Sequence, residues 1–246
     1  HRILEGDIKT VTIKRDTCHR LFVCFSVVCE VEIPDRVMTG ESAGLDFGLK
    51  TFLTDSNGIA YHSPEFLKQN LAQIGKLSRD LSRKQNGSKR RERAKFALSR
   101  AHIRLADKRT DSHYKLAHVL CKQFDSIYLE DLNIEGMKRL WGRKVSDLAF
   151  AEFVEILDWI AKKYGVQVVK IGRFEPTSQM CSHCGHLQDM PLRERTYQCQ
   201  TCDLQLDRDH NAALNIKRIG ASIPLPEACQ TGTCSCLVVD GRSPCL

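Results

Sequence analysis

The sequence lacks any uninterrupted apolar run long enough to cross a membrane, and no signal peptide opens it. These absences argue against a membrane-spanning chain and give no indication of export. Twelve cysteines would suit a disulfide-stapled secreted scaffold, but 246 residues with charged helical segments and paired CxxC spacing favour a reducing environment. We therefore expect a cytoplasmic protein with reduced thiols and no membrane partner.

Acidic residues are scarce in one stretch of the chain. Residues 68–109 contain 14 Lys and Arg against 3 Asp and Glu, whereas the remainder contains 23 against 27. A helix-rich segment that carries all the excess positive charge indicates a polyanionic partner, although a solvated charged face is the alternative. The candidates for phosphate contact follow the Asn86–Gly87 break: Arg90, Arg91 and Arg93.

The chain also lacks an initial methionine. Its first residue is His1, which falls inside an expected strand, so we expect the natural beginning to lie upstream. Residues 8–14 and part of 21–33 alternate apolar and polar side chains around Asp16, which predicts a β-hairpin. We interpret residues 1–38 as the last strands of a small barrel. Three cysteines there lack metal spacing and are expected to be ordinary thiols: Cys18, Cys24 and Cys29.

Two CxxC pairs separated by fourteen residues are the strongest single pattern in the sequence. Short turns let both sulfurs of each pair face one tetrahedral Zn²⁺, and four thiolates make a closed, structural site. Gly185 and Asp203, which follow the two pairs, are typical of a zinc ribbon, expected over residues 176–206. Two disulfides, or His183 or His186 in place of one cysteine, are the alternatives. The predicted ligands are Cys181, Cys184, Cys199 and Cys202.

The remaining chain has the pattern of an α/β core over residues 39–175. Asp55–Gly58 predicts a hairpin turn, and residues 65–124 predict two helices broken at residues 86–88. Strands are expected at 126–132 and 166–171, with a connector over 136–144 and a helix from about Ser146 to Gly165. A short helix opened by Asp209 is expected over 211–219, in a last core segment of 207–220. Residues 221–246, with four cysteines, are expected to be a disordered tail.

Acidic residues stand at the ends of these elements. Asp46 ends an apolar strand, where an unpaired carboxylate is unfavourable, so it is a metal-ligand candidate or a turn residue. Glu130 and Asp131 end another strand and should face opposite sides, so only one can join Asp46. The order of elements predicts a ribonuclease-H-like α/β nuclease with an inserted ribbon.

Four ordered motifs resemble the OrfB/TnpB family of insertion-sequence proteins, which is similar to the type V CRISPR effector nucleases. They are Gly44-Leu-Asp-Phe-Gly-Leu-Lys50, Tyr128-Leu-Glu-Asp-Leu-Asn133, the paired CxxC segments, and Asp207-Arg-Asp-His-Asn-Ala-Ala213. The resemblance covers roughly residues 1–220 and implies a RuvC-like, RNA-guided DNA endonuclease. In the family, the missing upstream region would hold guide RNA. Pro176-Thr-Ser-Gln179 stands where many members have Pro-Ser-Ser-Lys, so one possible phosphate-contacting lysine is absent.

By position, the resemblance assigns the three catalytic acids to Asp46, Glu130 and Asp209, with Asp131 and Asp207 as structural neighbours. Three carboxylates can hold two Mg²⁺ ions about 4 Å apart for in-line attack on a phosphodiester. Arg208 could steady the scissile phosphate, or it could be an ordinary surface residue. A non-catalytic nucleic-acid-binding remnant and a strand-transferring recombinase are the competing hypotheses.

Overall fold

The computed structural model describes residues 6–28, 37–191, 193–224 and 237–238, in two compact units. One unit holds the amino-terminal hairpin, helix α1 (Phe66–Ser82) and helix α2 (Lys89–Gln123) as far as His113. The other holds the central sheet, the end of α2 and the cysteine pairs. The division between the two units runs through α2.

The alternating residues near the amino terminus form an antiparallel hairpin, as predicted. Strand β1 (Asp7–Arg15) pairs with β2 (Leu21–Val28), and a short strand, β10 (Leu237–Val238), pairs with the other edge of β2. Asp16 stabilises the turn because its Oδ1 accepts the backbone N–H groups of Cys18 and Arg20, at 2.8 and 2.9 Å.

Two of the three thiols expected in the first 38 residues, Cys18 and Cys24, form no disulfide in the structure. Cys29 and the four tail cysteines lie outside the described residues. So does most of the expected tail, 221–246, whose described residues are the end of a helix and β10.

The two predicted helices are present and are joined by a tight turn. Gly87 lies in the left-handed region at φ 77°, so the sequence correctly places the break there. Arg91 Nη1 donates to the backbone carbonyls of Leu81 and Lys84, at 3.0 and 3.1 Å. Leu81 lies in the last turn of α1 and Lys84 lies two residues beyond the helix, where helical partners run out. Arg91 therefore ties the start of α2 to the end of α1.

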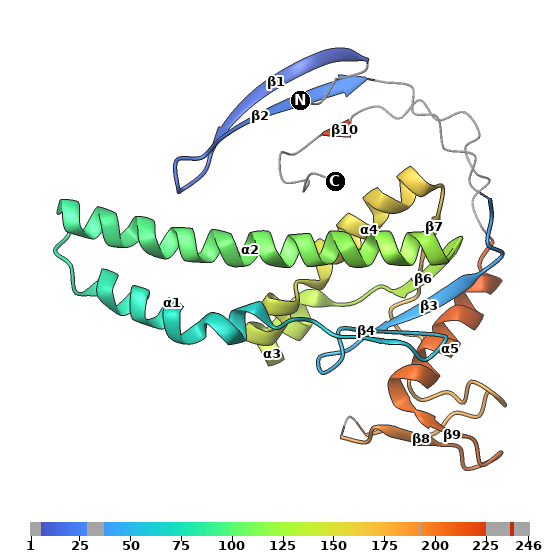
Figure 1. Ribbon diagram of the computed structural model, residues 1–246. Helices are drawn as coiled ribbons and strands as arrows, with labels where there is room; N and C mark the ends of the chain where they lie inside the picture. Colours follow the sequence, from blue (N-terminus) through green and yellow to red (C-terminus); the bar gives the residue numbers. More distant parts are fainter. Residues whose placement is uncertain (1–5, 29–36, 192, 225–236, 239–246) are drawn as a thin grey trace. The chain divides into compact units, whose positions relative to one another are not determined.

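Five strands form a mixed sheet in the order β5-β4-β3-β6-β7 (Figure 1). The first three form an antiparallel meander, and the last two are added parallel to β3. Their bounds are Ser42–Phe47 for β3, Leu53–Asp55 for β4, Ala60–Tyr61 for β5, Ser126–Glu130 for β6 and Gln167–Ile171 for β7. The predicted turn joins β4 to β5, with Asp55 Oδ1 accepting the N–H groups of Asn57 and Ile59.

The helices between β6 and β7 differ from the prediction. The segment expected to be a connector is helix α3 (Ile134–Leu148), with non-helical backbone angles at Trp141. Helix α4 (Phe150–Tyr164) begins four residues later than expected at Ser146, after Ala149 in the left-handed region. The sequence did not predict α3 because two glycines in the segment lower its intrinsic helix propensity. The helix is capped by Asn133, whose side chain accepts the Gly136 N–H at 3.0 Å. Gly165, at φ 67°, ends α4 as predicted.

The two faces of the sheet have different partners. One face meets the main hydrophobic core, formed with buried residues of α2 and α4; its sheet residues include Ala43, Leu45, Phe47, Ile127 and Leu129. The other face packs against helix α5 (Arg208–Ser222), which lies along β3 (Figure 1). Because side chains alternate along a strand, Asp46 and Glu130 point to the α5 face.

Gly44 allows α5 to approach the sheet closely. A Cβ atom on Gly44 would lie 2.2 Å from the Ala213 carbonyl oxygen and 2.4 Å from the Lys217 nitrogen. Any side chain at this position would therefore displace the helix. Among the described helices, none is long and apolar enough to cross a membrane.

Candidate active site and metal centre

Asp46 and Glu130 stand at the carboxyl ends of two adjacent parallel strands. Leu45 of β3 pairs with Leu129 of β6, so the next residue on each strand is one of the two acids. Neighbouring strands lie about 4.8 Å apart, and both acids point to the α5 face. The carboxyl ends of parallel strands are a frequent place for ligand sites.

The third acid, Asp209, enters this face from the first turn of α5. Asp207 caps the helix, since its Oδ1 accepts the backbone N–H groups of Asp209 and His210 at 2.9 and 3.2 Å. We expected Asp209 to open the helix; the structure gives that role to Asp207 and begins the helix at Arg208. This leaves the Asp209 carboxylate unused by the cap, and its Oδ2 lies 3.6 Å from the Cβ position of Gly48, just beyond β3.

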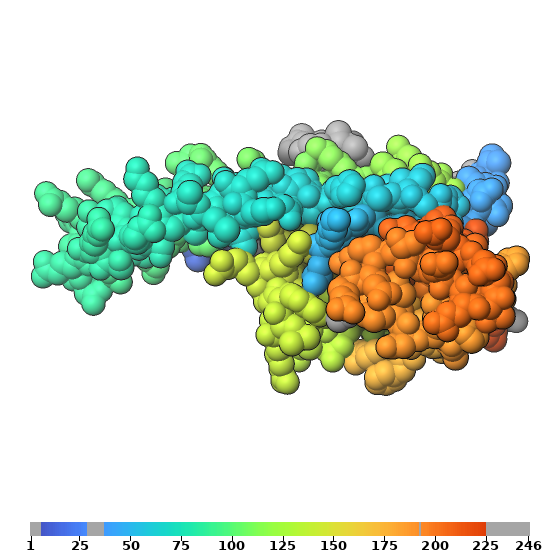
Figure 2. Space-filling view, turned by 90° about the horizontal axis from the view of Figure 1, so that it is seen from below, coloured from blue at the N-terminus to red at the C-terminus, as the bar shows by residue number. Residues whose placement is uncertain are grey.

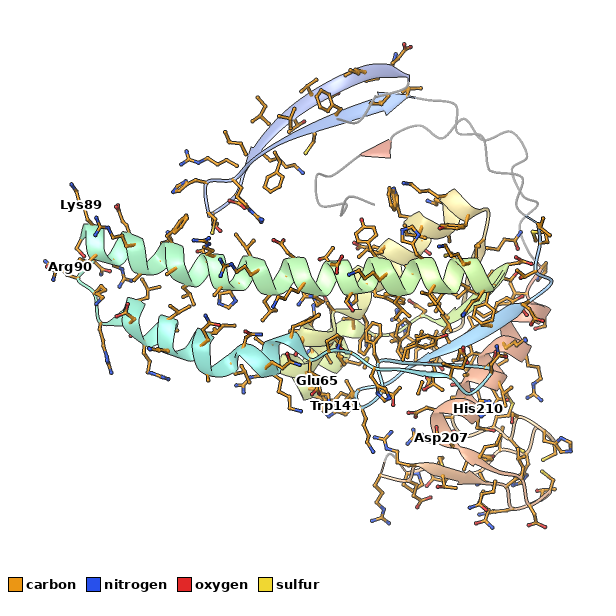
Figure 3. The ribbon with its side chains drawn as sticks, in the orientation of Figure 1. Glu65, Lys89, Arg90, Trp141, Asp207 and His210 are labelled. Atoms are coloured by element: carbon orange, nitrogen blue, oxygen red, sulfur yellow. The ribbon has the colours of Figure 1, made fainter. Side chains whose placement is uncertain are left out.

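The start of α5 is fixed from a second side. His210 Nε2 donates to the Ser56 carbonyl oxygen at 3.3 Å, in the turn between β4 and β5. Figure 3 labels Asp207 and His210 at this end of the helix, beside the cysteine module, the segment of residues 176–206 that carries both CxxC pairs. The cap and the histidine together hold the first turn of α5 against the sheet.

The acids influence one another electrostatically. Burial raises the pKa of Asp46 well above its usual range, and the charges of Glu130 and Asp209 raise it further. Burial likewise raises the pKa of Glu130, although a hydrogen bond from Thr177 opposes the shift. The pKa of Asp209 is raised by burial and then by Asp207, against the opposing charge of Arg195. Asp46 is thus the acid whose ionisation the charges of both others oppose.

The donor set of the three acids fits a hard divalent cation. Carboxylate oxygens are the ligands that Mg²⁺ prefers, and a cation would relieve the like-charge repulsion that raises the pKa of Asp46. Within the described part of the chain, the side chains grouped closely enough to hold a metal ion are those of the four cysteines, and the acids do not form such a group. Convergence of the acids on shared metal positions stays a prediction.

The four cysteines form a group that could hold a metal ion. The Sγ atoms of Cys181 and Cys202 lie 3.7 Å apart, and those of Cys184 and Cys199 lie 3.5 Å apart. A tetrahedron with Zn–S bonds of about 2.3 Å places its sulfurs about 3.8 Å from one another. All four are free thiols, so the two-disulfide alternative is not what the structure contains.

Local backbone geometry builds this thiol cluster. Gly185 and Asp203 both adopt positive φ, at 76° and 57°, and turn the chain after each CxxC pair. Strands β8 (Thr196–Gln198) and β9 (Gln205–Asp207) pair antiparallel across the second turn. Although burial opposes it, the backbone N–H groups of Thr201 and Cys202 lower the pKa of the Cys199 thiol to about 6. A thiolate, the form that binds metal, is therefore favoured there.

The cysteine module is attached to α5 by two buried asparagines. Asn211 Nδ2 donates to the Met180 carbonyl at 2.8 Å, and its Oδ1 accepts the Ser182 N–H at 2.9 Å. Asn215 Nδ2 donates to the carbonyls of Thr177 and Met180, at 2.8 and 2.6 Å. Figure 2 shows the module and α5 as one continuous lobe, in shades of orange.

The arginines predicted to contact phosphate have different surroundings. Arg90 and Arg93 are exposed, and Lys89 and Arg90 project from the start of α2 in Figure 3. Arg91 is engaged in capping α1. Arg208 is only 9 % exposed and donates to the Pro191 carbonyl at 3.2 Å. The observed contacts of Arg91 and Arg208 are thus structural.

Sequence reasoning missed several residues around the acids. Arg195 Nη1 lies 3.7 Å from Asp209 Oδ1 with half of its side chain exposed, and Lys50 also acts electrostatically on Asp209. Thr177 donates its hydroxyl to Glu130 Oε1. The motif around Thr177 stood out in the sequence, but nothing in its residue types pointed to a contact 47 positions away.

Two family models match adjacent parts of the chain. Residues 26–140 match OrfB_IS605, described as "Probable transposase", and residues 150–216 match the Cas12f1-like TNB domain. These matches confirm the resemblance to the OrfB/TnpB family that the sequence motifs indicated. A "Putative RNA-guided DNA endonuclease" of Streptomyces pristinaespiralis is 34% identical over 214 residues, covering 86% of this chain and 52% of that protein. "TnpB-like protein L79" of Acanthamoeba polyphaga mimivirus is 32% identical over 230 residues, covering 86% and 43%.

The chain thus spans about half the length of the curated OrfB/TnpB relatives it matches. Among solved structures, the Cas12f1–sgRNA–target DNA complex is similar, with a TM-score of 0.51 and 20% identity. The match covers 84% of this chain and 55% of that one. This likeness confirms the predicted α/β nuclease fold of the RuvC type, with its mixed sheet and flanking helices.

Proposed function

We propose that this chain is the nuclease portion of a transposon-encoded, RNA-guided DNA endonuclease of the RuvC type. One observation carries the proposal: Asp46, Glu130 and Asp209, far apart in sequence, all lie on the α5 side of the sheet. There, the charges of the other two raise the pKa of Asp46. Carboxyl groups whose pKa values are perturbed by burial together with specific charged neighbours cluster at functional sites.

Each acid has a distinct role in this proposal. Asp46 and Glu130, on adjacent strands, and Asp209, on α5, would hold Mg²⁺. The bound ions would supply an activated water and stabilise the leaving oxygen of a phosphodiester. Arg195, half exposed beside Asp209, is placed to orient the phosphate. Asp131 lies outside the group, since it is engaged with Arg173 at 2.6 Å.

The cysteine module would bind one structural Zn²⁺. Four thiolates fill a tetrahedral shell and leave no open position for a substrate. Its place beside Asp207 and α5 supports a role in holding the third acid. The partners would be DNA and a guide RNA, which the names of the endonuclease relative and of the Cas12f1 complex mention for those proteins.

The test is Mg²⁺-dependent cleavage of guide-matched DNA by the full-length protein. Asp46→Ala, Glu130→Ala and Asp209→Ala should each abolish cleavage while the protein remains folded. Asp131→Ala is the matched control and should be far milder, because it removes the acid next to Glu130, whose carboxylate pairs with Arg173.

Two outcomes would redirect the assignment. Loss of cleavage in Asp207→Ala with normal cleavage in Asp209→Ala would mean that the cap residue is the ligand. Normal cleavage in all three alanine variants would overturn the nuclease proposal and favour a nucleic-acid-binding remnant.

A further inference from the structure

Glu130 is the only one of the three proposed acids whose carboxylate accepts a hydroxyl hydrogen bond among the contacts of the described residues. The donor is Thr177 Oγ1, and the acceptor is Glu130 Oε1. Thr177 is 4 % exposed, so water does not compete strongly for this bond. The contact joins the end of β6 to the segment that enters the cysteine module.

Thr177 is itself fixed through its backbone. Its carbonyl oxygen accepts Asn215 Nδ2 at 2.8 Å, and its N–H donates to the Glu175 carbonyl at 2.8 Å. Asn215 is fully buried on α5, the helix that also carries Asp209. The hydroxyl that contacts Glu130 is therefore held by the same helix that supplies the third acid.

The same asparagine also contacts the cysteine module. Asn215 Nδ2 bonds the Met180 carbonyl at 2.6 Å, one residue before Cys181. Cys181 is completely buried and donates its N–H to the His186 carbonyl at 2.8 Å. An unbroken series of contacts thus leads from the thiol cluster through Asn215 and Thr177 to Glu130.

We propose that Thr177 is a positioning residue that fixes the Glu130 carboxylate for metal binding, and that the cysteine module holds Thr177 in place through Asn215. The inference rests on the proposed nuclease function. One oxygen of Glu130 accepts the hydroxyl, which orients the carboxylate and leaves the other oxygen for a cation. Partners that orient a ligand typically change metal affinity by about 10–100-fold when removed.

The first test measures Mn²⁺ binding to the full chain by calorimetry, without nucleic acid. Thr177→Val, which removes the donor at nearly constant volume, should weaken Mn²⁺ affinity about 10-fold or more, whereas Thr177→Ser should stay near the parent value. Ser178→Ala, which removes a hydroxyl one residue further on, is the matched control and should change little. Parent-like affinity in Thr177→Val would overturn the proposal.

The second test separates positioning from general destabilisation. In DNA cleavage by the full-length protein, Thr177→Val should raise the Mg²⁺ concentration needed for half-maximal rate, with kcat at saturating Mg²⁺ close to that of the parent. A loss of kcat that saturating Mg²⁺ does not restore would contradict a role in holding the ligand. If Asp46→Ala cleaves normally as well, the nuclease assignment fails, which is distinguishable from failure of Thr177 alone.

The third test addresses the link to the cysteine module. Asn215→Ala removes the donor to Thr177, whereas Asn211→Ala removes contacts only to Met180 and Ser182. Asn215→Ala should weaken Mn²⁺ binding more than Asn211→Ala, and it should add little in the Thr177→Val background. Equal effects of the two asparagines, or full additivity with Thr177→Val, would overturn the proposed link.

Discussion

At the scale of single residues, Asp46 is held in an environment that opposes its ionisation. Burial first, and then Glu130 and Asp209, raise its pKa well above the ordinary value. In the unfolded chain the same group titrates near its usual pKa of about 3.9. Folding therefore favours protonated Asp46, and its ionised form destabilises the metal-free protein as pH rises from about 4 through the raised pKa.

Asp46→Asn should consequently stabilise the protein when Mg²⁺ is absent. The melting temperature at pH 7 should exceed that of the parent, with each kcal/mol corresponding to about 2–4 °C in a chain of this size. The gain should shrink as pH falls below the raised pKa and disappear near pH 3, where the acid is protonated in both states. Thermal unfolding followed by circular dichroism across pH measures this.

Asp131→Asn is the control for this measurement. Its carboxylate pairs with Arg173 at 2.6 Å, and both side chains are nearly half exposed, so the variant should lose at most about 1 kcal/mol. A melting temperature of Asp46→Asn equal to or below that of the parent at pH 7 would contradict the clustered charge.

The residue types at the site could be predicted from the sequence, but the contacts between them could not. Asp46, Glu130 and Asp209 stood out as acids at element ends, and alternation along the strand predicted different surroundings for Glu130 and Asp131, whose partners are Thr177 and Arg173. By contrast, the cap formed by Asp207 and the Thr177–Glu130 bond depend on how α5 and the cysteine module dock. Neither pattern nor spacing along the chain encodes that docking.

At the scale of elements, the close approach of α5 to β3 depends on the absence of a side chain at Gly44. Gly44→Val would place atoms where the backbone of Ala213 and Lys217 now lies, at 2.2 and 2.4 Å from the Cβ position. We expect a loss of about 1–3 kcal/mol in the free energy of unfolding and a displaced Asp209, hence weaker Mn²⁺ binding.

Gly142→Ala is the control, since a Cβ there meets nothing within 4 Å. It should leave Mn²⁺ binding unchanged. Denaturant unfolding and calorimetry on both variants provide the measurement, and normal Mn²⁺ affinity in Gly44→Val would show that α5 tolerates the shift.

The arginines that follow the turn between α1 and α2 are expected to have two different roles, contact with DNA and stabilisation of the helical pair. Joint replacement of Arg90 and Arg93, both exposed, should flatten the dependence of log K on log salt for DNA binding by about two units. Arg91→Ala should instead lower the stability of the helical pair, because it removes two hydrogen bonds to the end of α1. DNA affinity measured at several salt concentrations distinguishes the two roles. If the slope of log K against log salt were unchanged in the double variant, Arg90 and Arg93 would be solvent-exposed charges without a phosphate contact.

Helix boundaries show where element prediction fails. Long periodic segments such as α2 were recognisable, and glycines with positive φ at positions 87 and 165 marked the correct breaks. Helix α3 was missed because Gly136 and Gly142 lower its intrinsic helix preference, and tertiary packing outweighs that preference.

At the scale of the whole molecule, the cysteine module should unfold without its metal while the central sheet persists. Structural zinc contributes on the order of 10 kcal/mol to such modules. Cys184→Ser should therefore lose zinc by elemental analysis and expose the amides of Cys181, Gly185 and Cys199 to rapid hydrogen exchange. Amides of β3 and β6 should stay protected.

Cys18→Ser serves as the control, because Cys18 lies in the amino-terminal hairpin unit and outside the thiol cluster. It should retain one zinc per chain. Absence of zinc from the parent protein, purified without chelator, would contradict the assignment of the four cysteines.

The position of Asp209 on α5 has a consequence for the nascent chain. Asp46 and Glu130 leave the ribosome first, and roughly 80 residues must follow before Asp209 is made, which takes about 4–16 s at 5–20 residues per second. Until then α5 does not cover its face of the sheet, and the group of three acids lacks Asp209. Synthesis itself thus delays the complete set of three acids until nearly all of the described chain has been translated.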